Sequence, residues 1–143
     1  MDSFDFASAP GHLIRRAHQV SVALFAEAAA AHDVTQVQFA LLNALIDAPG
    51  LDQVTLAQRV AMDAATSGSV IERLEGKGWL RRVRDPDDRR RRRVWITPAG
   101  EAVVAALKSA IADSQARLVA PLSAEEAQSL LQLLRKLVQT HSA

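Results

Sequence analysis

Apolar residues recur at helical spacing in the first part of the chain. Between Gly11 and Ala31 they are separated by three or four positions, which places them along one side of a helix. Pro10 lies at the expected first turn, where its missing amide hydrogen costs no helical hydrogen bond. We predict a long amphipathic helix over residues 11–31, with an apolar side formed by Leu13, Ala17, Val20, Leu24 and Ala28.

A second helix is predicted from Thr35. Thr35 and Gln38, three positions later, form the pattern of a capping box, in which each side chain satisfies a free backbone amide at the helix start. The helix should end near Pro49 and Gly50, because both residues disfavour its continuation. Its apolar side is formed by Phe39, Leu42, Leu45 and Ile46.

Two helices separated by only a few residues are predicted next. Thr55 is a candidate N-cap for the first, TLAQRVAM, and Asp63 is a candidate N-cap for the second. The second helix should end at Gly76 or Gly78, because glycine readily closes a helix.

The periodicity changes after Gly78 from helical to alternating. The runs WLRRVR and RRVWI flank the turn signal DPDD at residues 85–88, and this order predicts a β-hairpin. The alternation places Val94 and Ile96 on the inner face of the hairpin, and Arg93 and Trp95 on the other face.

Two further helices are predicted after the hairpin. Thr97 and Pro98 should open a helix that Pro121 ends, and Ser123 with Glu126 forms a second capping box for a helix to the C-terminus. The apolar stripes of the first, fifth and sixth helices are too long for one chain to cover, so we predict a homodimer built from them. In the last two helices the stripes contain Val103, Leu107, Ala110, Ile111, Ser114 and Leu118, and then Leu130, Leu133, Leu134, Leu137 and Val138.

The order of these elements predicts the fold class. A short helix, a tight connection, a second helix and a hairpin between Thr55 and Ile96 describe a winged helix-turn-helix, within a mainly α-helical protein. We expect a single domain over residues 1–143, with a DNA-binding lobe at 35–97 and a helical dimerisation region at 10–34 and 98–143. The alternative is a winged-helix module for protein assembly, whose basic hairpin binds an acidic partner.

Positive charge is concentrated around the hairpin. From Arg73 to Arg93 there are ten basic residues and four acidic ones, a balance of +6 in a chain whose formal net charge is +1, which leaves −5 for the rest. A basic segment on an acidic body is expected when one surface meets the phosphates of double-stranded DNA and the remainder avoids them. On the charge count alone, a solvated basic loop is the alternative.

Other sequence features exclude several classes of function. The chain has no cysteine, which excludes a disulfide framework and thiol-based redox sensing. Its four histidines lack the spacing of a zinc site, and it has no nucleophile elbow or phosphate loop, so we expect no metal, no cofactor and no enzymatic activity. It has neither an apolar run long enough for a membrane span nor a signal-peptide pattern, so we expect a cytoplasmic protein without a membrane partner.

One side of the predicted fourth helix carries groups that can donate hydrogen bonds to DNA. Small polar side chains near the helix start let the backbone approach the major groove and offer hydroxyls to base edges or phosphates. An ordinary surface helix can show the same mixed face, but the adjoining basic hairpin favours DNA binding. The candidate DNA-binding residues of this helix are Thr66, Ser67, Ser69, Arg73 and Lys77.

The hairpin tip supplies the second part of the predicted DNA interface. A hairpin beside a major-groove helix can reach the neighbouring minor groove, whose narrow A·T-rich stretches attract an inserted arginine. Only one side chain fits there, and the others should bind phosphates. Asp88 is expected to orient a neighbouring guanidinium through a charge-assisted pair. The candidates at the tip are Asp88, Arg89, Arg90 and Arg91.

These motifs closely resemble the MarR family of winged-helix transcription regulators. The resemblance rests on DAATSGSVIERLEGKGWL at residues 63–80, RDPDDRR at 84–90 and VWITPAG at 94–100, and the flanking helices match in order and length. It implies a DNA-binding regulator similar to the branch that responds to aromatic acids. It also matches Asp88 and Arg90 to the family's Asp-x-Arg pair, which makes Arg90 the implied minor-groove residue.

A polar set on the first helix is a candidate effector site. His12, Arg16 and Gln19 are spaced by four and three positions on the flank of the apolar stripe, where they can also be the solvated edge of a dimer helix. Regulators that resemble this chain commonly bind small aromatic acids or phenols between the dimerisation helices and the DNA-binding lobe. We therefore predict a repressor whose aromatic effector meets these three residues and Phe39, with a ligand-free regulator as the alternative.

Overall fold

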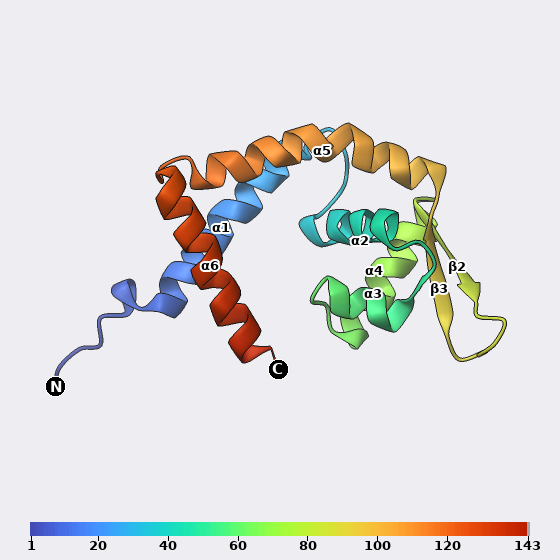
Figure 1. Ribbon diagram of the computed structural model, residues 1–143, viewed down its shortest axis with the longest axis horizontal. Helices are drawn as coiled ribbons and strands as arrows, with labels where there is room; N and C mark the ends of the chain where they lie inside the picture. The colour runs from blue at the N-terminus through green and yellow to red at the C-terminus, as the bar shows by residue number, and fades with distance from the viewer. Residues whose placement is uncertain (143) are drawn as a thin grey trace. The chain divides into compact units, whose positions relative to one another are not determined.

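The computed structural model, drawn as a ribbon in Figure 1, describes residues 1–142. The chain divides into two compact units. Unit 1 comprises Met1–Leu24 with Ala112–Ala143, and unit 2 comprises Phe25–Ile111. Both boundaries fall inside long helices, α1 (Pro10–Ala28) and α5 (Pro98–Val119). Each of these helices therefore contributes one part to unit 1 and the other part to unit 2.

Unit 2 contains the elements predicted for a winged helix. Helices α2 (Gln36–Asp47), α3 (Gln53–Arg59) and α4 (Ala64–Gly76) are followed by strands β2 (Leu80–Arg84) and β3 (Arg92–Ile96). The two strands pair antiparallel as a hairpin, with Leu80 opposite Ile96. The predicted fold class, mainly α-helical with a β-hairpin wing, is confirmed.

The core of unit 2 is formed by the apolar sides of its helices and the inner face of the sheet. Val94 is completely buried and Ile96 packs against the core, as the alternation of the second strand predicted. Full burial of one such aliphatic side chain contributes about 1.5–3 kcal/mol. The largest fully buried residues are Leu41, Leu42, Leu45, Leu56, Ile71, Leu74, Leu80 and Val94.

A third strand, which the sequence did not predict, completes the sheet. Strand β1 (Leu51–Asp52) pairs with β3, so the order is β1-β3-β2 and β3 is central. Two residues are too few to show an alternating pattern, which explains why this strand was missed. The strand joins the wing to the connection that precedes α3.

Asp52, rather than Thr55, is the N-cap of α3. Its Oδ1 accepts a hydrogen bond from the Thr55 backbone amide at 2.7 Å, and its Oδ2 accepts one from the Thr55 hydroxyl at 3.0 Å. The prediction that Thr55 opens this helix was wrong, because the carboxylate three residues earlier captures both of its donors. The predicted cap of α4 is confirmed, since Asp63 accepts from the Thr66 amide at 2.7 Å.

The helix ends around unit 2 follow the predicted chemistry. Thr35 and Gln38 form the capping box of α2. At the end of α4, Gly78 takes φ +78° and its amide donates to the Glu75 carbonyl, while the Trp79 amide donates to the Leu74 carbonyl. This pair of bonds is a Schellman motif, which requires the left-handed conformation at the glycine.

Unit 1 contains the first part of α1, the last part of α5 and α6 (Ala124–His141). The Ser123–Glu126 capping box opens α6, as predicted, and α1 ends at Ala28 instead of continuing to Ala31. No residue of α6 is buried, although the helix carries the predicted apolar stripe. Leu130, Leu133, Leu134, Leu137 and Val138 are all exposed in the single chain.

Candidate nucleic-acid interface

The first turns of α4 present hydroxyl groups to solvent. Thr66, Ser69 and Arg73 are exposed, whereas Ser67 is buried and its hydroxyl donates to the Ala64 carbonyl. The Ser69 hydroxyl donates to the Thr66 carbonyl, which leaves its oxygen lone pairs free to accept. The structure therefore brings three of the five candidate residues of this helix to the surface and turns Ser67 inward.

Lys77 has partners within unit 2. Its ammonium donates to the backbone carbonyl of Asp33, lies 3.4 Å from the Asp33 carboxylate and stands 4.5 Å from the centre of the Trp79 ring. These contacts fix the end of α4 to the segment before α2. These contacts could not be predicted from the sequence, because Asp33 lies 44 positions earlier in the chain.

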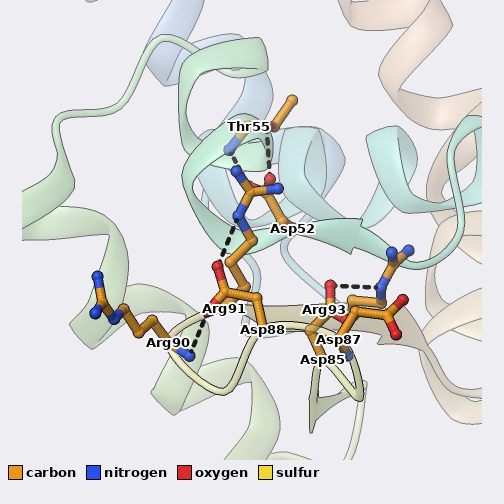
Figure 2. Close-up of polar contacts among 8 residues, drawn as sticks. All are labelled: Asp52, Thr55, Asp85, Asp87, Asp88, Arg90, Arg91 and Arg93. Atoms are coloured by element: carbon orange, nitrogen blue, oxygen red, sulfur yellow. Dashed lines mark hydrogen bonds and ion pairs between the residues drawn. The ribbon is translucent and has the colours of Figure 1, made fainter.

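Asp88 organises the tip of the wing through both carboxylate oxygens (Figure 2). Its Oδ1 accepts from the Arg90 backbone amide at 3.0 Å, and its Oδ2 lies 3.7 Å from Nε of Arg91. Asp88 thus lies beside the guanidinium of Arg91, whereas Arg90, which the resemblance matched to the Asp-x-Arg pair, meets Asp88 only through its backbone amide. In Figure 2 the Arg90 side chain extends away from this pair.

A basic cavity of about 470 Å³ lies between the start of α3 and the wing. Hydrogen bonds from Thr55 hold the pKa of Asp52 below its ordinary value, and the positive charge of Arg91 lowers it further. Four arginines and one carboxylate line this cavity, so its wall favours an anionic group such as a phosphate. The lining residues are Asp52, Gln53, Val54, Thr55, Arg82, Arg90, Arg91 and Arg92.

An ion pair joins α4 to the wing beside this cavity. Nη2 and Nε of Arg82 lie 2.9 Å and 3.3 Å from Oε1 of Glu75, and the Arg82 backbone amide donates to Oε2 at 3.1 Å. The Arg82 side chain is the first cause of a lowered pKa at Glu75. Sequence reasoning missed this pair as part of the site, because it counted Arg82 only toward the charge of the segment.

The candidate effector residues are spread over both units. The rings of His12 and Phe6 have their centres 5.0 Å apart and are tilted by 51°, and Arg16 and Gln19 are exposed on α1. Phe39 belongs to unit 2, where its ring lies 6.2 Å from that of Phe25. His12, Arg16 and Gln19 therefore belong to unit 1 and Phe39 to unit 2.

Unit 1 instead contains an apolar groove of about 510 Å³. Two residues from the predicted apolar side of the first helix, Leu13 and Ala17, are in its wall, and His18 and Ser21 supply polar groups that the sequence did not single out. The other lining residues are Ile14, Leu118, Val119, Leu130 and Leu134.

Within residues 1–142, no group of three or more histidine, aspartate or glutamate side chains could hold a metal ion. No helix in the same range is both long and apolar enough to cross a membrane.

Comparisons with known proteins agree with the winged-helix fold of unit 2. A sequence profile of the MarR family matches residues 32–91. The transcriptional regulator HosA of Escherichia coli is 40% identical over 109 residues, which cover 76% of this chain and 80% of HosA.

Two solved structures are similar along nearly the whole chain. PcaV from Streptomyces coelicolor, a transcriptional regulator in complex with its natural ligand, has a TM-score of 0.91 and 38% identity, covering 97% of this chain and 98% of PcaV. BpsR of Bordetella bronchiseptica, whose DNA binding is regulated by 6-hydroxynicotinic acid, has a TM-score of 0.90 and 34% identity, covering 95% and 97% of the two chains.

Proposed function

The chain belongs to the MarR family of transcription regulators, as its motifs predicted, and from this premise we propose a homodimeric repressor that an aromatic acid or phenol releases from DNA. The observation that carries the proposal is the wing tip, where Asp88 pairs with Arg91 and holds the backbone of Arg90. This arrangement favours one projecting guanidinium beside others that can meet phosphates.

The proposed DNA contacts divide between two grooves. Thr66, Ser69 and Arg73 on the exposed side of α4 would enter the major groove, and Arg90 would enter the adjacent minor groove. The cavity beside the wing would hold a backbone phosphate, with Arg91 contributing to it. Arg89 would add a further phosphate contact. Ser67, which is buried, and Lys77, which contacts Asp33 at the surface, would support α4 instead of meeting DNA.

The proposed dimer uses the exposed apolar surface of unit 1. Soluble proteins rarely leave long apolar stripes open, so the stripes of α1, α5 and α6 would be covered by a second copy of the chain. On this assignment residues 35–97 form the DNA-binding lobe, and residues 10–34 with 98–143 form the dimerisation region. The dimer would act in the cytoplasm, on double-stranded DNA, without a catalytic step.

The proposed effector is a small aromatic acid or phenol. BpsR supports this class, because its DNA binding is regulated by 6-hydroxynicotinic acid. The ring would lie against Leu13 and Ala17, the carboxylate against Arg16, and His12 or Gln19 would hydrogen-bond a ring hydroxyl. Release requires that the effector bind the DNA-free arrangement more tightly, and a tenfold loss of operator affinity needs a difference of about 1.4 kcal/mol.

The test measures whether an effector releases the protein from DNA. Release is monitored by the fluorescence anisotropy of a labelled operator. Hydroxybenzoates, hydroxycinnamates, their thioesters and 6-hydroxynicotinic acid would be titrated against the complex. We expect at least one compound to release the wild-type protein, Arg16→Ala to lose that response, and Arg15→Ala, the neighbouring exposed arginine, to keep it. Unchanged release in Arg16→Ala with normal DNA affinity would remove Arg16 as the anion anchor, and no release by any compound would favour the ligand-free regulator.

A further inference from the structure

We propose that Arg93 is a positioning residue of the wing. Its guanidinium joins Asp85, in the hairpin turn, to Gly50, in the connection before β1, and thereby sets the position from which Arg90 reads DNA. The inference rests on the proposed DNA binding and goes beyond it, because it assigns one arginine of the basic run to holding the wing instead of contacting DNA.

The guanidinium of Arg93 uses two different nitrogens for its two partners, of which Figure 2 shows Asp85. Nε donates to Oδ2 of Asp85 at 3.2 Å, and Nη1 donates to the backbone carbonyl of Gly50 at 3.3 Å. Only an arginine fork offers donors in fixed, separate directions, because a lysine ammonium is a single point on a flexible stem. A lysine at this position would keep the positive charge but would not make both hydrogen bonds.

Asp85 links this bond to the turn that carries Arg90. Its side chain is only 8% exposed, and its Oδ1 accepts from the Asp87 amide at 2.9 Å. Its own amide donates to the Arg91 carbonyl at 3.0 Å, which closes the turn from the other side. Arg90 is thus held in a turn whose two ends both meet the residue that Arg93 binds.

Gly50 provides a fixed acceptor at the other end of Arg93. Its φ is +77°, a conformation that favours glycine. A Cβ at this position would also lie 2.7 Å from Cη2 of Trp95, so the space excludes a side chain as well. Its amide donates to the Val94 carbonyl at 3.1 Å. Since the backbone of Gly50 is held by β3 and by the Trp95 ring, its carbonyl cannot move freely to follow the wing.

A charge argument separates positioning from simple attraction to DNA. Removal of the Asp85 carboxylate makes the wing more positive, and this change alone should strengthen binding to any DNA sequence. If the carboxylate instead holds Arg93 and the turn, its removal should weaken binding to the operator relative to random DNA. The two accounts therefore predict opposite signs for the same substitution.

The experiment compares Asp85→Asn and Arg93→Lys with Asp87→Asn, an exposed carboxylate two residues away that gives the same change of charge. Affinity for an operator selected from random duplexes and for a scrambled duplex would be measured by anisotropy at several salt concentrations. We expect Asp85→Asn and Arg93→Lys each to lower the operator-to-random ratio roughly tenfold, within the range for loss of one base contact. Asp87→Asn should leave that ratio unchanged.

The double variant Asp85→Asn/Arg93→Lys adds a test of coupling. Because both residues act through one contact, we expect its ratio to match that of either single variant instead of falling a hundredfold. An unchanged ratio in Arg93→Lys, or an Asp85→Asn variant that behaves like Asp87→Asn, would overturn the proposal. Tryptophan fluorescence checks the folding of unit 2; if Asp85→Asn unfolds, the charge-conserving Arg93→Lys decides the result. Failure of the wild-type protein to prefer any operator would overturn the proposed function instead.

Discussion

The two units of the chain differ in how far their apolar residues are buried. Every apolar residue of the buried core, from Phe25 to Leu107, belongs to unit 2. Unit 1 contains most of the large apolar residues that remain exposed, including Leu13, Ile14 and the stripe of α6. A core of this kind stabilises unit 2 within one chain. Unit 1 leaves apolar surface exposed, and this is the surface that the proposed dimer would cover.

The polar groups show the same contrast. Unit 2 has four carboxyl groups whose pKa is lowered by hydrogen bonds or ion pairs, namely Asp52, Asp63, Glu75 and Asp85. In unit 1 only Glu126 has a lowered pKa among the described residues, because it accepts from the Ser123 backbone in the capping box. Defined polar contacts therefore accompany the half of the molecule that the proposal assigns to DNA.

The largest expected effect comes from a charge in the stripe of α6. Leu134→Asp would place a carboxylate without a partner in the proposed interface, at a cost of about 3–5 kcal/mol per buried unpaired charge. We expect the wild-type chain to sediment as a dimer at low micromolar concentration and the variant to sediment as a monomer. Gln132→Asp, on the other side of the same helix, is the control and should remain dimeric. A wild-type monomer, or equal sedimentation of the two variants, would contradict the assignment of unit 1 to dimerisation.

The next effect is a loss of stability confined to unit 2. Gly50→Ala forces a methyl group into the left-handed region and against the Trp95 ring, so we expect a loss of about 2–4 kcal/mol of unfolding free energy. Both tryptophans, Trp79 and Trp95, belong to unit 2, so their fluorescence during urea unfolding measures this unit. Gly11→Ala is the matched control, since a Cβ there meets nothing within 4 Å, and it should be neutral or stabilising. Equal midpoints for the two variants would refute the account of Gly50.

Substitutions of two wing arginines should reduce DNA affinity by similar amounts but should affect sequence preference differently. Arg90→Ala should cost about 1–3 kcal/mol and relax the preference for A·T pairs at the minor-groove step. Arg91→Ala should weaken binding to all sequences alike and lower the salt slope by about one. Titrations on selected and scrambled duplexes would measure both effects. If both variants lost affinity equally on the two duplexes, the roles assigned to these residues would be wrong.

The smallest expected effect is an acid sensitivity of unit 2. A carboxyl group whose folded pKa is lowered stabilises the fold above its unfolded pKa, which is 3.8 for aspartate and 4.5 for glutamate, and this contribution disappears as the pH falls through the folded pKa. Tryptophan fluorescence should therefore show unit 2 losing stability as the pH drops below 4.5. Asp63→Asn keeps an N-cap but cannot titrate. The variant should therefore lose less unfolding free energy than the wild type as the pH falls. Equal acid dependence in that variant would count against this explanation.

Much of unit 2 could be predicted because its signals are local. Thr35 with Gln38, Asp63 before α4 and the turn DPDD each act through neighbours within a few residues. The same property caused the error at α3, because Asp52 and Thr55 both have cap chemistry and only the conformation shows that Thr55 is the donor. Strand β1 was missed because its paired residues in β3 lie 41 and 43 positions later (93 − 52 and 94 − 51), and nothing in two residues indicates pairing.

The site residues were harder to predict where contacts join distant segments. Lys77 has the helical spacing of a DNA-binding residue, but its ammonium meets Asp33. Arg93 looks like one more member of a basic run, and its distinction depends on the carbonyl of Gly50, 43 positions earlier. Spacing identifies which face of an element a residue occupies, but it does not identify which distant group will meet it there.

Selection of binding sites from a pool of random DNA duplexes tests the central claim most directly. If unit 2 reads DNA and unit 1 holds two copies together, the enriched sequences should contain an inverted repeat with half-sites about 10 bp apart and A·T-rich positions at the wings. Enrichment of a single unrepeated half-site would contradict the dimer that the exposed surface of unit 1 predicts. No enrichment over the starting pool would contradict the account of unit 2 as a reader of DNA sequence.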